Sequence, residues 1–213
     1  MALQHGGAVQ ILAFFSQKGG SGKTTLAVHT AVAAHEAGAE VVLIDTDPQK
    51  SATVWGDARE AQKPLVATAS PSDLDVVLTA ARQEGMTLAI VDAAPHAAPE
   101  AARIARAASL VVIPCRPSAF DIAAAEGAVR IVKAAGAKAV FVLSACPFRA
   151  PEIGETREAL SGYGLSVAPV EITDRRAFSR ALATGRSVTE FEGDGKAAAE
   201  IRALWIWLQG QMA

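Results

Sequence analysis

The fold of this chain is decided by the stretch VQILAFFSQKGGSGKTT, residues 9–25. Its first half, Val9–Ser16, is almost entirely apolar, which predicts a buried strand. A glycine-rich loop follows, and a helix is expected over Gly22–Ala37. Glycines let a loop turn its backbone N–H groups toward an anion, and the first turn of a helix adds positive partial charge. The stretch therefore predicts a phosphate-binding loop.

Two lysines lie in this loop. At this spacing Lys23 is expected to reach the β- and γ-phosphates of a nucleotide, and the Thr24 hydroxyl to bind Mg²⁺. The common pattern GxxxxGK[ST] requires glycine at position 17, but the chain has Gln17 there and a second lysine, Lys18, just after it. A second ammonium group suits a triphosphate, which carries about four negative charges.

Residues 18–25, KGGSGKTT, resemble the deviant Walker A motif of the ParA/MinD family of P-loop ATPases, and Lys18 matches its signature lysine. The resemblance implies ATP and Mg²⁺ as cofactors. It also implies a nucleotide sandwich dimer in which Lys18 crosses to the partner's phosphates, with Lys18, Lys23 and Asp47 as the catalytic residues. The expected nucleotide contacts are Gln17, Lys18, Gly19, Gly20, Ser21, Gly22, Lys23, Thr24, Thr25 and Pro114.

Three carboxylates follow apolar strands. Asp45 and Asp47 are two residues apart, so in extended chain they point the same way, and beside a triphosphate they would need Mg²⁺ between them. The DTDPQ run resembles the second nucleotide motif of the family, which implies that Asp45 lies in the water shell of the metal and that Asp47 positions the attacking water. Asp92 ends the run LAIVD and is expected to hold Mg²⁺ through water. The expected metal residues are Thr24, Asp45 and Asp92.

The chain departs from the family pattern in two places. Asp92 is followed by Ala93-Ala94-Pro95, where the family often has Thr-Pro-Pro, and the chain contains no asparagine to read adenine. The run from Ile113 to Asp121 resembles an IPxxPSxxD stretch near the nucleotide and the dimer interface. A proline-rich turn that caps a helix through Ser118 explains this run equally well.

Short apolar runs alternate with alanine-rich helical segments along the whole chain, which predicts an α/β fold with a mostly parallel twisted sheet of about seven strands and helices on both faces. The expected strands are 9–16, 40–45, 65–69, 87–92, 110–114, 138–144 and 166–170. The expected helices are 22–37, 51–62, 72–84, 98–107, 119–135, 152–161, 175–183 and 196–209.

Composition sets further bounds. A length of 213 residues with 51% hydrophobic content fits a single P-loop ATPase domain over residues 1–213. The formal net charge of −2 means that any DNA binding must come from a local basic patch and be sensitive to salt. The two cysteines form no CxxC pair, no apolar run reaches the ~18 residues of a membrane helix, and no secretory signal is recognisable. We expect a cytoplasmic protein.

Two surfaces near the end of the chain are candidates for partners. One is a basic segment that resembles the DNA-binding segment of ParA proteins, although an ordinary solvated helix explains it equally well. Its candidate DNA-binding residues are Arg175, Arg176, Arg180 and Arg186. The other is the last helix, whose Ile201, Leu204, Trp205 and Leu208 lie at helical spacing. This stripe is expected to pack on the sheet, because only Lys196 and Arg202 are basic and a membrane anchor of the MinD kind is rich in lysine.

The resemblance implies a short ParA-type ATPase that acts as a nucleotide switch. ATP would drive a homodimer that binds nonspecific DNA on the nucleoid, and a centromere-binding or cargo adaptor would stimulate slow hydrolysis, so that a plasmid, chromosome region or protein cargo is positioned. The alternatives are a MinD-like ATPase on a membrane surface, an electron-transfer iron protein of the same fold, and a scaffold that binds nucleotide without hydrolysis.

Overall fold

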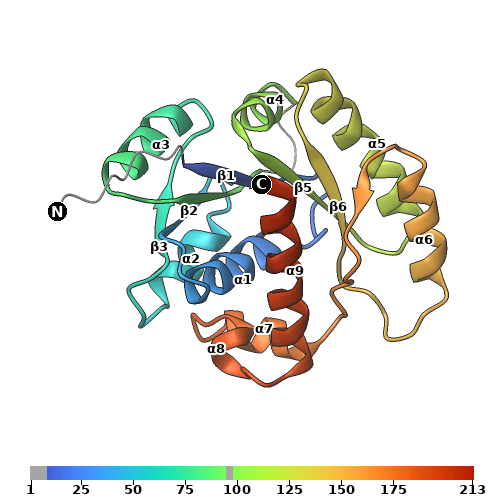
Figure 1. The fold of residues 1–213 in the computed structure, drawn as a ribbon. Helices are drawn as coiled ribbons and strands as arrows, with labels where there is room; N and C mark the ends of the chain where they lie inside the picture. The colour runs from blue at the N-terminus through green and yellow to red at the C-terminus, as the bar shows by residue number, and fades with distance from the viewer. Residues whose placement is uncertain (1–8, 95–97) are drawn as a thin grey trace.

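The computed structural model describes residues 9–94 and 98–213 as a three-layer α/β domain (Figure 1). Its centre is a seven-stranded sheet in the order β3-β2-β4-β1-β5-β6-β7, and every neighbouring pair of strands is parallel. The strands are β1 (Gln10–Phe14), β2 (Val41–Asp45), β3 (Leu65–Thr68), β4 (Leu88–Asp92), β5 (Leu110–Cys115), β6 (Ala139–Leu143) and β7 (Ser166–Val167).

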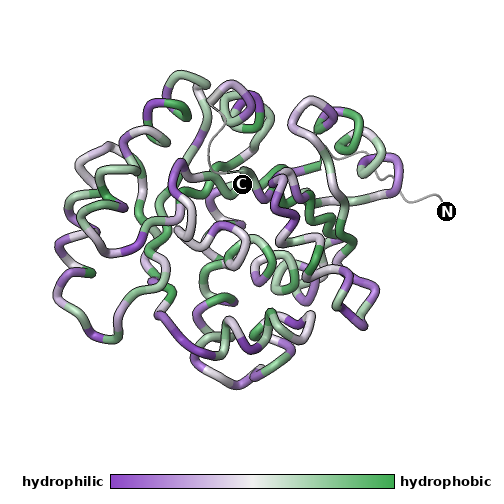
Figure 2. Tube along the Cα trace, turned by 180° about the vertical axis from the view of Figure 1, so that it is seen from behind, coloured by the Kyte–Doolittle hydropathy of each residue, from purple (hydrophilic) through white to green (hydrophobic). Residues whose placement is uncertain are grey.

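Helices cover both faces of the sheet, because its central strands are apolar on both sides. One face packs against α1 (Lys23–Glu36), α2 (Ser51–Asp57), α7 (Arg176–Leu182), α8 (Val188–Phe191) and α9 (Lys196–Met212). The other packs against α3 (Leu74–Gln83), α4 (Ala98–Ala107), α5 (Ala119–Ala134) and α6 (Glu152–Ser161). The hydrophobic segments gather in the strands at the centre (Figure 2).

The register of the sheet brings the ends of three strands together. Asp92 at the end of β4 lies opposite Phe14 of β1 on one side and Asp45 of β2 on the other. The loop after β1 therefore starts beside both carboxylates. In parallel sheets of this kind, ligands bind beyond the carboxyl ends of the strands.

The structure confirms the expected mostly parallel sheet and corrects some element boundaries. Helix α2 ends at Asp57 and not at residue 62. Beyond it, the Arg59 side chain donates to the carbonyl oxygens of Lys63 and Gly185, and these bonds hold the following residues in a loop. Strand β7 ends at Val167, three residues earlier than expected. The four-residue helix α8 was not expected.

The last helix packs as expected, with Ile201, Leu204, Trp205 and Leu208 buried against α1 and the sheet. Within residues 9–94 and 98–213, none of the helices has the length and apolar character needed to cross a lipid bilayer.

Candidate nucleotide site

The loop between β1 and α1 is shaped by two glycines in the left-handed region, Gly20 with φ 74° and Gly22 with φ 95°. Gly22 stands directly before α1, so the free N–H groups of the first helical turn open into the loop. The hydroxyls of Ser16 and Ser21 are 2.7 Å apart, and the Ser144 hydroxyl donates to the Ser21 carbonyl at 2.6 Å. These buried contacts hold the loop in a fixed shape beside β6.

Lys23 lies inside this loop with 6% of its surface exposed. Its Nζ donates to the Lys18 carbonyl oxygen at 3.3 Å. Burial lowers the pKa of Lys23, and the nearby carboxylates of Asp92 and Asp47 act in the opposite direction. A buried ammonium group is stabilised by a nearby anion, and a bound phosphate would supply one.

Lys18 points to the other side of the loop. Its Nζ lies 2.6 Å from the Asp121 carboxylate, and the exposed fraction of the two side chains is 41% and 5%. Asp121 belongs to α5, whose first turn is capped by Ser118, with its hydroxyl accepting from the Asp121 N–H at 3.2 Å. The structure therefore shows the capping role for Ser118 and adds an ion pair to it.

The Gln17 side chain lies against α5 at Gly127, where an added Cβ would overlap its amide group. Pro114 of β5 borders the same small space as Ser16, Gln17 and Lys18. The residue that replaces the usual glycine thus packs the phosphate loop onto the helix that carries Asp121.

Thr24 and Asp92 form the part of the site where a metal ion is expected. The Thr24 hydroxyl donates to Asp92 Oδ2 at 2.6 Å, and Asp92 Oδ1 is buried with no hydrogen-bond partner among the described residues. Burial raises the pKa of Asp92 to about 7, and Asp45 and Asp47 add to the rise. An orphaned carboxylate oxygen beside a threonine hydroxyl fits Mg²⁺, which proteins hold with few side chains and the phosphates of a ligand. In residues 9–94 and 98–213, no group of three or more His, Cys, Asp or Glu side chains could hold a metal by itself.

Asp45 and Asp47 lie at the same edge but have different contacts. Asp45 is fully buried and accepts from the Thr53 N–H at 2.8 Å, the Thr53 hydroxyl at 2.9 Å and the Asp47 N–H at 3.1 Å. The Asp47 carboxylate accepts only a bond from the Gln49 N–H, at 2.9 Å, among the described residues. Asp45 thus anchors the start of α2, whereas Asp47 keeps acceptor capacity for a water.

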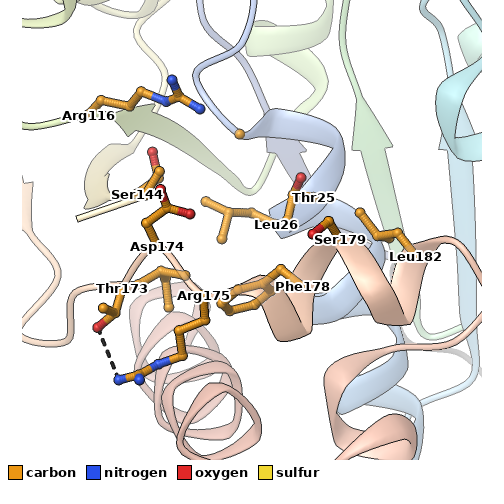
Figure 3. Close-up of a pocket in the computed structure, with 13 residues that line it drawn as sticks. Thr25, Leu26, Arg116, Ser144, Thr173, Asp174, Arg175, Phe178, Ser179 and Leu182 are labelled. Carbon is orange, nitrogen blue, oxygen red and sulfur yellow. Dashed lines mark hydrogen bonds between the residues drawn. The ribbon is translucent and has the colours of Figure 1, made fainter. Parts of the chain in front are cut away.

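A cavity of about 240 Å³ opens beside the first turn of α1 (Figure 3). Its walls come from α1, from the segments after β5 and β6, and from residues 172–182. They are formed by Gly22, Thr25, Leu26, Arg116, Ser144, Ala145, Ile172, Thr173, Asp174, Arg175, Phe178, Ser179 and Leu182. Its position next to the phosphate loop suits the nucleoside part of a nucleotide.

The four candidate DNA-binding arginines differ in their surroundings. Arg175 is half-buried and pairs with Glu200 at 2.6 Å, so its charge is compensated within the chain. Arg176 and Arg186 are exposed, and Arg180 is exposed with Glu192 at 4.0 Å and its guanidinium over the Phe191 ring. The structure brings Arg176 and Arg180 onto the short helix α7.

The family model described as CobQ/CobB/MinD/ParA nucleotide binding domain matches residues 12–188, which includes the phosphate loop, all three aspartates and the arginine segment. The chain belongs to this family. A protein named ParA from Rhizobium radiobacter is 27% identical over 87% of this chain and 89% of its own length. The maintenance of carboxysome distribution protein A of Gloeobacter kilaueensis is 31% identical over 90% of this chain and 89% of its own length.

Solved structures of this ParA/MinD family share the fold. Apo McdA from Cyanothece superposes with a TM-score of 0.77 at 16% identity, over 94% of this chain and 99% of that one. A chain of the MinC:MinD cell division protein complex of Aquifex aeolicus gives a TM-score of 0.79 at 14% identity, over 95% of this chain and 96% of that one.

Sequence reasoning missed two residues of this candidate site, Thr53, which holds Asp45, and Asp174, which lines the cavity. It placed Asp121 in the run that resembles IPxxPSxxD but did not predict its ion pair with Lys18. The bond of Thr53 to Asp45 depends on how α2 folds back onto the end of β2, and Asp174 reaches the cavity from a segment far from the phosphate loop in the sequence. Pro95, which belongs to the motif after β4, lies outside the described residues.

Proposed function

We propose that the chain is an ATP- and Mg²⁺-dependent switch ATPase that forms a homodimer with ATP, binds nonspecific DNA in that state, and positions DNA or a protein cargo. A centromere-binding or cargo adaptor protein stimulates its slow hydrolysis and releases it. The observation that carries the proposal is the second lysine of the phosphate loop. Lys18 is directed away from the loop that Lys23 occupies and is 41% exposed, so it lies where a second subunit could approach it.

The chemistry divides among the residues of the loop and the strand ends. Lys23 and the N–H groups of the first turn of α1 bind the phosphates and stabilise charge on the leaving group. Thr24 and Asp92 would hold Mg²⁺, which would supply positive charge to stabilise the charge that develops on the phosphates. Asp47 orients the attacking water, since its carboxylate retains free acceptor sites, and Asp45 keeps the Asp47 backbone in place through the bond to its N–H.

Lys18 connects nucleotide binding to dimer formation. In the single chain its ammonium is neutralised by Asp121, which is almost fully buried. We infer that ATP in a facing subunit offers a stronger set of anionic oxygens, and that Lys18 leaves Asp121 to reach them. Because Asp121 is buried, the departure of Lys18 costs more than the breaking of a surface ion pair. The Ser118 hydroxyl also donates to the Asp121 carboxylate and offsets part of this cost, and the several anionic oxygens of a triphosphate supply the rest.

Helix α7 connects the nucleotide to the DNA surface. Phe178, Ser179 and Leu182 face the cavity, while Arg176 and Arg180 are exposed. A nucleotide that fills the cavity fixes the helix from within and thereby sets the position of the arginines. We propose Arg176, Arg180 and Arg186 as the DNA surface, with Arg175 positioning the segment through Glu200.

The test measures binding to a random-sequence DNA duplex by fluorescence anisotropy, with ATP, ADP or no nucleotide. We expect binding with ATP and Mg²⁺ only, and its loss at high salt, because the contacts are to phosphates. Arg176→Glu should weaken binding by about 10-fold or more. Arg82→Glu is the matched control, since Arg82 is exposed on α3 at the opposite face of the sheet.

An ATP-dependent dimer without DNA binding at low salt would contradict the DNA part of the proposal and point to a protein or membrane surface. Equal losses in Arg176→Glu and Arg82→Glu would show that only the net charge matters. No nucleotide binding at all would refute the switch itself.

A further inference from the structure

The walls of the cavity beside α1 differ in chemistry from one end to the other. Gly22 and Thr25 lie at the first turn of α1, where the phosphate loop ends. Leu26, Ile172, Phe178 and Leu182 form an apolar lining farther along. A flat heterocycle fits such a lining, while its polar edge must meet hydrogen-bonding groups that are correctly placed.

Most hydroxyls of the cavity are already engaged. Ser144 donates to the Ser21 carbonyl at 2.6 Å, Thr173 donates to Glu200 at 2.9 Å, and Ser179 donates to the Arg176 carbonyl at 3.1 Å. Each of these protons is used to hold the fold together. The hydroxyls therefore have no proton left to donate to a base, and their oxygens are neutral acceptors, which attract an amino group less strongly than a carboxylate does.

Asp174 differs from these hydroxyl residues because its side chain is not engaged within the fold. Its N–H donates to the Cys146 carbonyl at 2.8 Å, which fixes the backbone at the cavity wall, and within the described part of the chain its carboxylate has no hydrogen-bond or ion-pair partner. Figure 3 shows the carboxylate directed toward Ser144 and Leu26, whereas the neighbouring Arg175 turns away toward Thr173. An ionised carboxylate can only accept hydrogen bonds.

We propose that Asp174 is the residue that selects the base, by accepting a hydrogen bond from the exocyclic amino group of adenine in this cavity. The chain has no asparagine, so no side-chain amide of that type can perform this task. Among the described residues, the other polar side chains of the lining without a hydrogen-bond partner are Thr25 and Arg116. Arg116 has only donors and cannot accept from an amino group, and the Thr25 hydroxyl lies at the phosphate end of the cavity. The inference rests on the proposed nucleotide binding by the phosphate loop.

The test compares ATP with purine riboside 5′-triphosphate, which differs only in lacking the amino group. Binding of each in the presence of Mg²⁺ is measured by calorimetry for the full chain and for Asp174→Ala. We expect the wild type to prefer ATP by about 10-fold, the loss typical of one hydrogen bond to a charged group. In Asp174→Ala this preference should fall to about 1, with affinity for purine riboside triphosphate nearly unchanged.

Two further variants sharpen the result. Asp174→Asn keeps an acceptor oxygen without the charge and should retain part of the preference for ATP. Asp194→Ala removes a carboxylate from an exposed position in the loop between α8 and α9 and should leave the preference intact. Binding of purine riboside triphosphate to every variant reports that its site is folded.

The proposal is overturned if the wild type does not distinguish the two nucleotides, or if Asp174→Ala weakens both equally. In either case ATP still binds, so the proposed switch function survives. If neither triphosphate binds the wild type, the proposed function and this inference both fail.

Discussion

Gly185 lies against the backbone of the segment that follows α2. It has φ 65°, and a Cβ built there would lie 2.6 Å from the Ala58 carbonyl carbon and 2.7 Å from Arg59 Cα. The neighbouring atoms are backbone and cannot rotate away. Gly185→Ala should therefore force the loop after α2 away from the segment before α8, where Arg59 donates to the Gly185 carbonyl at 3.0 Å and pairs with Glu190.

Two contributions give the expected loss of folding free energy in Gly185→Ala. An alanine held at positive φ costs about 1 kcal/mol. Overlap with the fixed backbone adds about 2 kcal/mol, in the range of other overpacked sites. Gly136 provides a matched control, because it has the same φ of 65° and no atom within 4 Å of an added Cβ. Gly136→Ala should thus cost only the first contribution.

The measurement is urea or thermal unfolding of the wild type and both variants. At about 3 °C per kcal/mol for a domain of this size, Gly185→Ala should lower Tm by about 10 °C and Gly136→Ala by about 3 °C. Equal losses in the two variants would show that only the backbone angle matters and would refute the argument from close contact.

Two other predictions concern a buried histidine and the exposed lysine. Burial lowers the pKa of His29 to about 3, so below pH 6.5 the unfolded chain binds a proton that the folded chain does not. Stability should fall by about 2 kcal/mol between pH 6.5 and pH 5, and His29→Gln should flatten this slope; an unchanged slope in urea titrations would contradict the assignment. Lys18→Ala should bind ATP but remain monomeric by light scattering, since Lys23 still holds the phosphates, and a persistent ATP dimer would exclude the proposed crossing.

The sequence predicted most of the fold because its signals are local. The runs that form β2, β4, β5 and β6 are apolar on both faces, and this pattern is typical of a central strand in a parallel sheet. Helices α4 and α6 have the predicted bounds, 98–107 and 152–161. Helix α8 was missed although Ser187 and Glu190 form a capping box, because four residues are too few to show a period.

The candidate site was predictable where its residues belong to a recognised motif, and not where they meet only through the fold. The phosphate loop follows from its own glycines and from the strand and helix on either side. Thr24 and Asp92 are 68 residues apart, and the order of the motifs together with the family resemblance assigned both to one metal site. Lys18 and Asp121 are 103 residues apart, and no periodicity in the sequence reports the contact of a loop with a distant helix.

The pairing of Lys18 with Asp121 has a consequence for how the proposed switch responds in a cell. In the proposed switch, Lys18 pairs with Asp121 in the monomer and with the partner's nucleotide in the dimer. The concentration of the active dimer then depends on the square of the monomer concentration. The fraction of dimer would then rise with local crowding as well as with the supply of ATP. Molecules gathered on one cargo would form dimers, and dispersed molecules would return to monomers in which Lys18 pairs with Asp121. The strength of this ion pair thus influences the protein concentration at which dimers form.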